Sequence, residues 1–342
     1  MDATSTGPDA TALLRRLATY RADDRRAFGQ LAQSLILFAG LWWAMIAALE
    51  VSYLLTLLLV IPAGFILLRI FIIQHDCGHG SFTSSKRLNQ RIGRALGVLT
   101  FTPFDYWKHT HSIHHATSGN LDRRGHGDVT TLTVDEYQAL TKAGRLGYRI
   151  YRNPLTILGF GPFFQFFIKH RLPLDAPRHW HDAWRSVWMT NLGIAATVGL
   201  ATWTIGLPHY LMIQLPLTLF TATFGVFLFY VQHQYEGTYW ERQDKWNFGT
   251  AALHGSSFLD LPRPLHWLTG NICYHHLHHL ASRVPNYRLP EAFAEIKEAR
   301  AVPHLNLGDA FRSLRLHLWD EHERRLIRFS DLPGDLRSEP QS

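Results

Sequence analysis

Four histidines fall within one stretch of fourteen residues, "WKHTHSIHHATSGN" at 107–120. Histidine is the commonest metal ligand in proteins, and it is the only side chain whose unperturbed pKa lies near neutral pH. Two further clusters occur, "HDCGH" at 75–79 and "HHLHH" at 275–279. Such clusters either hold metal ions or transfer protons, and the spacing of their histidines distinguishes these uses.

Each cluster has the spacing that one face of an α-helix would bring together. Successive helical residues advance by about 100°, so residues i and i+4 lie about 40° apart and residues i, i+3 and i+4 share an arc of about 100°. A zinc site takes four ligands, or three and a water, so eight imidazoles imply two metal ions. Imidazole suits Zn, Cu, Fe and Ni, so the ligand type alone does not choose the metal. The predicted ligands are His75 and His79, then His111, His114 and His115, then His275, His278 and His279.

The third cluster contains four histidines, whereas the spacing i, i+3 and i+4 provides three ligand positions. The set made of His275, His278 and His279 spans about 100° on an ideal helix. With His276 as its first member, the set would span about 160°. We therefore predict a ligand role for His275, and for His276 at most a packing contact or a contact that supports a ligand. His109 would point away from the other histidines of its cluster and is predicted to be structural. No role is assigned to the histidines outside the clusters, His126, His254 and His266.

Other residues beside the clusters are candidates for supporting roles. Asn271, one turn before His275, could hold a ligand water or cap a helix. Carboxylates and amides next to metal ligands commonly orient imidazole N–H groups, although a solvated surface position is the alternative for each of them here. Cys77 and Cys273 are expected to be small packing residues, reduced and not joined in a disulfide. The candidates for orienting the imidazoles are Asp76, Asn120, Asp122 and Asp128.

Two long apolar blocks must position the histidine clusters. From Phe28 to Leu68 there is no Lys or Arg and a single acidic residue, and from Val187 to Tyr230 there is no charged residue of the Asp, Glu, Lys or Arg types. A helix needs about 20 apolar residues to cross a bilayer, so each block can make two crossings joined by a tight turn. Turns are expected near Glu50–Ser52 and near Ile205–Tyr210. The alternative is a pair of core helices in a soluble protein, but buried core helices are usually shorter.

The sequence therefore predicts an all-α integral membrane protein in which the whole chain, 1–342, forms a single domain. All 34 Lys and Arg residues lie outside the two blocks, and the net charge is +7. By the positive-inside rule, both termini and all three clusters are expected on the cytoplasmic side. The predicted crossings are 31–50, 52–73, 187–206 and 209–231, and the predicted cytoplasmic cap comprises 74–186 and 232–342.

A third apolar run, Asn153–Ile168, has 16 residues and contains Gly159, Gly161 and Pro162. It is short for a crossing, and a crossing here would place the basic tail outside. We expect it to lie at the membrane surface or to form a re-entrant turn. The N-terminus lacks the basic-then-apolar order of a cleavable signal, and residues 331–342 are expected to form a frayed end.

The stretches "HDCGHGSF", "HSIHHATSGNLDRRGHGD" and "GNICYHHLHH" resemble the three histidine boxes of the integral-membrane fatty acid desaturases. The resemblance runs from about Phe71 to Leu289, is greatest to bacterial acyl-lipid desaturases, and also fits the two hairpins. In that family the matching eight histidines bind two iron ions, and a ninth histidine often lies in the region of His233.

The resemblance implies an enzyme that uses O2 and a di-iron centre to introduce a cis double bond into the acyl chain of a membrane lipid. Ferredoxin or a similar protein would supply electrons, and the bacterial inner membrane would be the location. Zinc has no redox chemistry, so it could not activate O2 for this reaction. The aromatic residues of "TPFDYW" and "GFGPFFQFF" could line an acyl tunnel or the membrane interface, although core packing is the expected role of any single one of them. No nucleic-acid partner is expected.

Two alternatives remain open at this point. A hydroxylase of alkyl or carotenoid chains would use the same scaffold, and the sequence hardly distinguishes hydroxylation from desaturation. A membrane metal transporter would need metal-binding or ionisable residues inside its spans, and between Val187 and Tyr230 the only candidate is His209, at a hairpin tip. The third box begins with His275 where front-end desaturases typically carry Gln, and the chain has no room for a fused cytochrome b5-like domain. These features favour a methyl-end or mid-chain enzyme with a separate electron donor.

Overall fold

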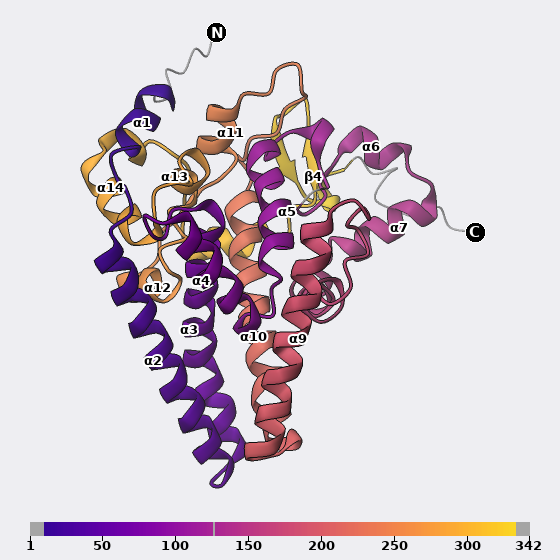
Figure 1. Ribbon diagram of the computed structural model, residues 1–342. Coiled ribbons are helices and arrows are strands. Elements are labelled where there is room, and N and C mark those ends of the chain that lie inside the picture. The colour runs from indigo at the N-terminus through magenta and orange to yellow at the C-terminus, as the bar shows by residue number, and fades with distance from the viewer. Residues whose placement is uncertain (1–9, 126, 333–342) are drawn as a thin grey trace.

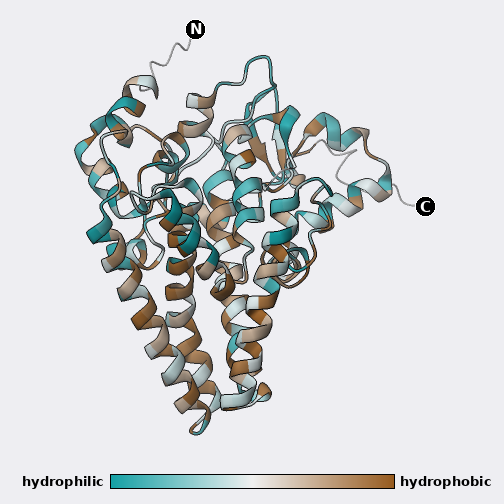
Figure 2. Ribbon diagram, viewed as in Figure 1, coloured by the Kyte–Doolittle hydropathy of each residue, from teal (hydrophilic) through white to brown (hydrophobic). Residues whose placement is uncertain are grey.

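The computed structural model describes residues 10–125 and 127–332. His126 and most of the frayed end expected at 331–342 lie outside these residues. The described chain is mostly helical, and two long helical hairpins project from a broader part that carries shorter helices and small sheets (Figure 1). The hairpins are the most uniformly apolar part of the molecule (Figure 2).

The first hairpin consists of α2 (Asp24–Leu49) and α3 (Tyr53–His79). The turn between them falls where the sequence predicts it. Helix α2 begins before the predicted crossing of 31–50, and α3 continues past the end of the predicted crossing of 52–73. As a result, α3 carries the first histidine cluster in its last turns. The helix ends at Gly80, whose φ of +69° is the left-handed conformation that glycine adopts readily.

The second hairpin consists of α9 (His181–Ile205) and α10 (Leu207–His233), which pack against each other. Gly206, with a φ of +83°, is the single residue between them. Apart from Gly206, the predicted crossings of 187–206 and 209–231 lie within these helices, which are longer than predicted. Because α10 continues to His233, this histidine ends a helix, as His79 does in the first hairpin.

Among the described residues, three helices are both long and apolar enough to cross a membrane: α2, α3 and α10. The fourth predicted crossing, α9, is helical but less apolar, because Asn191 and several threonines and tryptophans interrupt its apolar residues. Asn191 is bound to Arg171, accepting from Nη1 at 2.7 Å and donating to the main-chain oxygen at 2.9 Å.

The all-α prediction is wrong in one respect, because two small sheets occur. Strands of two or three residues are too short to show the alternating pattern by which strands are predicted. Both sheets fasten the C-terminal part of the chain to earlier segments. One sheet has the order β1 (Leu132–Thr133), β4 (Leu318–Asp320), β5 (Arg325–Ile327), with β1 and β4 parallel and β4 and β5 antiparallel; the other pairs β2 (Phe258–Leu259) with β3 (His304–Leu305) in parallel.

Shorter helices surround the ends of α3 and α10. Helix α4 packs its apolar side on α3 and contributes Leu96 to the same core as Ile70 and Ile73. The short α-helices are α1 (Ala10–Leu17), α4 (Lys86–Leu99), α5 (Phe104–Thr117), α6 (Val134–Ala139), α7 (Lys142–Tyr151), α11 (Phe248–His254), α12 (Arg263–Leu268), α13 (His275–Leu280), α14 (Leu289–Glu295) and α15 (Leu307–Ser313). The 3-10 helices are η1 (Leu121–Arg123), η4 (Asn286–Arg288), η5 (Lys297–Arg300) and η6 (Phe329–Asp331).

The apolar run predicted to avoid a crossing forms a chain of short helical pieces. These are the π-helix η2 (Thr156–Phe160), the α-helix α8 (Gly161–Phe164) and the π-helix η3 (Gln165–Lys169). The Thr223 hydroxyl of α10 donates to the Leu158 carbonyl at 2.9 Å, which attaches this segment to the side of α10. Leu155 is 82% exposed and Phe160 is 62% exposed. The segment therefore presents apolar side chains outward.

Candidate metal centre

Four helices bring nine histidines together at the junction between the hairpins and the broader part. The first box lies in the last turns of α3 and the second on α5, which starts after Pro103 and ends at Ser118. The third box opens α13, and His233 ends α10. All three boxes are thus helical, as their spacing predicts.

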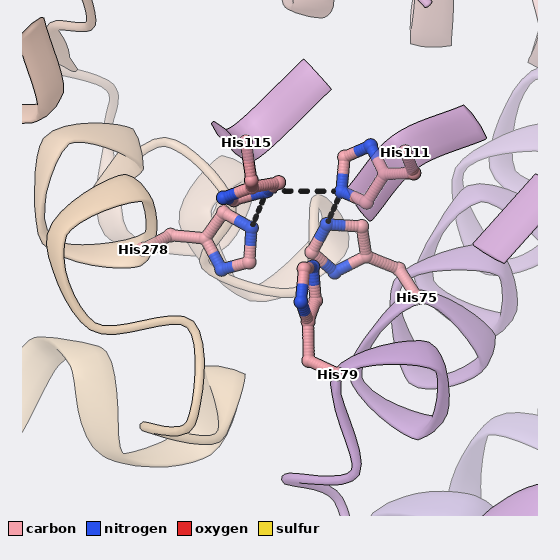
Figure 3. Close-up of side chains that lie close together, drawn as sticks. All are labelled: His75, His79, His111, His115 and His278. Atoms are coloured by element: carbon pink, nitrogen blue, oxygen red, sulfur yellow. Dashed lines mark hydrogen bonds between the residues drawn. The ribbon is translucent and has the colours of Figure 1, made fainter. Parts of the chain in front are cut away.

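Five of these histidines converge in what we call the first group (Figure 3). One ring nitrogen from each lies within 4.8 Å of the corresponding nitrogens of the others. The Nε2 atom of His111 lies 3.0 Å from that of His75 and 3.1 Å from that of His115. The Nε2 atom of His115 also lies 3.0 Å from that of His278. The members of the first group are His75, His79, His111, His115 and His278.

Four other histidines form the second group. Ring nitrogens of His114, His233 and His279 lie within 4.8 Å of one another, and all three side chains are buried. His275 joins them because its Nε2 atom lies 2.9 Å from that of His233. The second group is therefore His114, His233, His275 and His279.

The second and third boxes divide their histidines between the two groups in opposite ways. Helix α5 supplies His111 and His115 to the first group and His114 to the second. Helix α13 supplies His278 to the first group and His275 and His279 to the second. The rings of His115 and His279 stack with centroids 4.2 Å apart, so the two groups are adjacent.

The contacts within the groups suit metal ions better than hydrogen bonds. Each imidazole nitrogen has one in-plane position, which holds either a hydrogen or a lone pair. The Nε2 atoms of His111 and His115 each face two other Nε2 atoms, so hydrogen bonding cannot satisfy every contact. A cation bound by the converging lone pairs can satisfy all of these contacts. In the described part of the chain, the buried ring nitrogens of the two groups without a hydrogen-bond partner are His79 Nε2, His114 Nδ1 and Nε2, His275 Nδ1, His278 Nδ1 and His279 Nε2.

The predicted ligands on α5 and α13 are also in the protonation state that binds metal. Loss of hydration, with smaller contributions from neighbouring imidazoles, lowers the pKa of every box histidine on α5 and α13 well below its usual value. These rings are therefore neutral near pH 7, and a neutral ring offers a lone pair. The residues present fit a centre of two metal ions held by imidazole.

Several groups outside the cluster hold the rings in place. Asp76 Oδ1 lies 3.3 Å from His75 Nδ1, and the Gly255 carbonyl lies 2.9 Å from His233 Nδ1. The Trp107 ring stacks on His111 with centroids 4.5 Å apart. In each of the first two contacts Nδ1 can donate, which leaves the Nε2 lone pair for a metal.

His276 points away from both groups. Its Nε2 atom donates to the Ala299 carbonyl at 2.9 Å, and burial lowers its pKa to about 3. The side chain therefore joins α13 to the η5 segment. The ring of His109 packs against Trp180 with centroids 4.1 Å apart, also outside the groups.

The structure brings only some of the predicted supporting residues to the histidines. Asp76 contacts His75, and Asp128 lines a small cavity together with His114 and His233. Asn271, whose φ is +59°, donates from Nδ2 to the Asn286 carbonyl at 3.1 Å.

Asn120 and Asp122 have their hydrogen bonds elsewhere. Asn120 donates to Gln243 Oε1 at 2.9 Å, and Asp122 accepts from Arg242 Nη1 at 3.0 Å. The reason is local, because Gly119, with a φ of +73°, turns the chain away from α5 just before these residues. Among the described residues, neither side chain bonds to a histidine, so the structure does not support their predicted role.

Sequence reasoning overlooked Asn286, which is fully buried and bonds to Asp76. It lies in "RVPNYR", where nothing in the spacing of residue types singles it out. The free thiols of Cys77 and Cys273 are both buried and unbridged, as predicted.

A helical membrane scaffold with two adjacent groups of imidazoles defines a membrane protein with a candidate dinuclear metal centre. Comparison with known families narrows this class. The family model described as fatty acid desaturase matches residues 51–308, which include all three boxes and His233. The chain belongs to the fatty acid desaturase family and is an enzyme of unsaturated fatty acid metabolism.

Three relatives illustrate the similarity. A fatty acid desaturase of Bacillus subtilis is 42% identical over 318 residues, covering 93% of this chain and 90% of its own. An sn-1 acyl-lipid omega-3 desaturase (ferredoxin) of Synechocystis is 28% identical over 259 residues, covering 73% of this chain and 67% of its own. An sn-1 oleoyl-lipid 12-desaturase of Picosynechococcus is 27% identical over 240 residues, covering 67% of this chain and 65% of its own.

Proposed function

We propose that this desaturase uses O2 and a di-iron centre to introduce a cis double bond into a fatty acyl chain of a membrane lipid, with electrons from ferredoxin or a similar donor. The observation that carries the proposal is the convergence of nine histidines into two adjacent groups in a chain of this family. The names of the cyanobacterial relatives support acyl lipids as the substrate class, and one of those names includes ferredoxin.

In this proposal the first group holds one iron and the second group holds the other. The ligands are the eight box histidines and His233, with Asp76 orienting His75. Imidazole is a suitable ligand for iron, and the unpartnered ring nitrogens described above are available for it.

Iron is invoked because an unactivated –CH2–CH2– pair has no acidic hydrogen that a side chain could remove. When bound, the two irons would supply the oxidising power of O2 for breaking two C–H bonds. The overall reaction consumes the acyl chain, O2, two electrons and two protons, and it yields the cis alkene and two waters.

The protein itself contributes binding and orientation. Hydrogen bonds from Nδ1 fix His75 and His233 with Nε2 directed into the groups, and Trp107 covers one face of His111. The second group is buried, which keeps bulk water from its nitrogens. The acyl chain must be held with one methylene pair beside the irons, because positioning of this kind supplies much of the rate.

We further propose that the chain is a single domain that crosses the membrane four times, with both termini and the metal centre on the cytoplasmic side of a bacterial inner membrane. Apolar side chains on the outer faces of the hairpins support this: Ile36, Trp43 and Trp203 are 71%, 73% and 83% exposed. The segment around Phe160 would lie at the membrane surface. Cysteines introduced at Val51 and Gly206 should react with a membrane-impermeant reagent added from outside intact cells, and a cysteine at Arg312 should not.

Analysis of lipids tests the reaction. A host expressing this chain should gain a double bond in its membrane-lipid acyl chains under aerobic conditions, as detected by mass spectrometry. Expression of the His275→Ala variant is the control and should give no new unsaturation. A hydroxylated product without unsaturation would contradict the desaturase assignment in favour of a hydroxylase.

The electron donor can be tested separately. The net charge of +7 would attract an acidic ferredoxin, and salt weakens such long-range attraction. Turnover with ferredoxin should therefore fall as ionic strength rises. A rate that is independent of salt, or turnover supported only by a cytochrome, would contradict this choice of donor.

A further inference from the structure

The Asp76 carboxylate is buried next to the first group. Its side chain belongs to a residue that is 1% exposed, and its Oδ1 atom contacts His75 Nδ1. Among the described residues, no Lys or Arg forms an ion pair with it. A buried carboxylate without a cation is costly unless hydrogen bonds satisfy its oxygen atoms. The groups that bond to Asp76 therefore determine where it can lie.

Asn286 provides those bonds. Its main-chain N–H donates to Asp76 Oδ2 at 2.6 Å, and its side-chain Nδ2 donates to the same oxygen at 2.8 Å. Two donors from one residue converge on one oxygen, and the other oxygen is left for His75. Because Asn286 belongs to the short helix η4, these donors come from a segment 210 residues away in the sequence.

The orientation of the Asn286 amide is fixed from its other side. Gln30 Nε2 donates to Asn286 Oδ1 at 2.8 Å, so the amide nitrogen faces the carboxylate. The reversed amide would place an oxygen atom against Asp76, where two acceptors would repel each other. Gln30 lies on α2, and its carbonyl accepts from Ser34 Oγ of the same helix at 2.7 Å. A chain of hydrogen bonds thus runs from α2, which carries no histidine, to His75.

We propose that Asn286 is a positioning residue that holds Asp76 against His75 Nδ1 and so directs the His75 Nε2 lone pair into the first group. The inference rests on the proposed function in that it treats His75 as a metal ligand. The geometry matches this role, since His75 Nε2 lies 3.0 Å from His111 Nε2 within the group. Gln30 acts one step further out by fixing the Asn286 amide.

The proposal predicts a local loss of metal affinity. Removing a partner that orients a metal-bound imidazole typically lowers metal affinity or activity by about 10–100-fold. Asn286→Ala removes the Nδ2 donor and keeps the main-chain N–H, so Co2+ should bind the first group about 10-fold more weakly, at the low end of this range, while the second group keeps its affinity. The measurement is titration of the purified, metal-free full chain in lipid nanodiscs with Co2+, followed by its absorption bands.

A matched control is available in Asn89, another buried asparagine close to the end of α3. It is 2% exposed, accepts the Thr83 N–H at 2.9 Å and donates to the Thr83 carbonyl at 3.0 Å, and none of its bonds reaches Asp76. Asn89→Ala should lower the thermal midpoint of unfolding while both Co2+ affinities stay unchanged. If Asn89→Ala weakened Co2+ binding as much as Asn286→Ala, the effect would be general destabilisation and the proposal would be wrong.

A double-mutant cycle tests whether Asn286 acts through Asp76. Asp76→Asn should itself weaken Co2+ binding by the first group. Adding Asn286→Ala should then change this Co2+ affinity by less than about twofold, because the effects of substitutions at coupled residues are not additive. Additive losses would contradict the proposal.

If Asn286→Ala does not fold, Gln30→Ala provides the same test in milder form. It leaves Asn286 in place, and the Co2+ affinity of the first group should fall severalfold; an unchanged affinity would contradict the proposal. This experiment does not measure desaturation. A wild-type chain that binds two Co2+ ions and shows no effect of Asn286 would overturn this inference alone, whereas a wild-type chain that binds no metal would overturn the proposed function.

Discussion

The two groups of histidines differ in where their members come from. The first group draws on all three boxes, and the second draws on the second and third boxes plus His233. His233 takes in the second group the place that the α3 histidines take in the first. Each hairpin therefore delivers histidine at the end of its second helix, α3 to the first group and α10 to the second.

This difference teaches that the eight box histidines are not enough to describe the centre. Without His233, the second group would contain three imidazoles and the first would contain five. With it, the numbers are four and five. The groups also differ in burial, because every member of the second is buried whereas His79, His111 and His115 are half-buried. The first group should therefore tolerate the loss of a ligand better.

The largest effect is expected from His233→Ala. It leaves three imidazoles in a fully buried group, so we expect one iron to be lost and turnover to be abolished. The measurement is iron per chain and double bonds formed, in membranes that contain equal amounts of each protein. Two irons per chain with full activity would contradict the assignment of His233 to the second group.

A smaller effect on metal content is expected from His79→Ala. Four imidazoles would remain in the first group, so the variant should keep close to two irons per chain. Turnover should still fall by at least about 10-fold, because the remaining ligands are no longer held as in the native centre. Loss of one iron here, equal to that in His233→Ala, would show that the two groups do not differ in tolerance.

The third box allows a comparison within one helix. His275→Ala should abolish turnover and release one iron. His276→Ala should keep both irons and lose at most about 10–100-fold in activity. His276→Ala should instead lower the thermal midpoint, because it leaves the buried Ala299 carbonyl without its partner, at a cost of about 1–3 kcal/mol. Iron loss in His276→Ala but not in His275→Ala would contradict the structure of this box.

The smallest effect is expected outside both groups. Asp122 is exposed and bonded to Arg242 and Gln243, so Asp122→Asn should leave iron content and turnover unchanged. The control is Asp76→Asn, which removes the carboxylate beside His75 and should reduce turnover. A loss of iron in Asp122→Asn would restore the supporting role that the sequence suggested for it.

Helical spacing predicted which box histidines converge, because residues i, i+3 and i+4 share a face whatever the surroundings. It could not predict that His114 and His278 join different groups from their box neighbours, since the packing of α5 against α13 decides this. The hairpins were predictable from long apolar runs. The strands of two or three residues were not, and neither was the turn at Gly119 that directs Asn120 and Asp122 away from the histidines.

The central claim is that nine histidines hold two metal ions in two groups, one of which needs His233. The most direct test is an anomalous-scattering map recorded at the iron absorption edge from crystals of the iron-loaded protein. We predict two peaks, one among the Nε2 atoms of His75, His111 and His115, and one between His233 and His275. A single peak, or two peaks that both lie away from His233, would contradict the account.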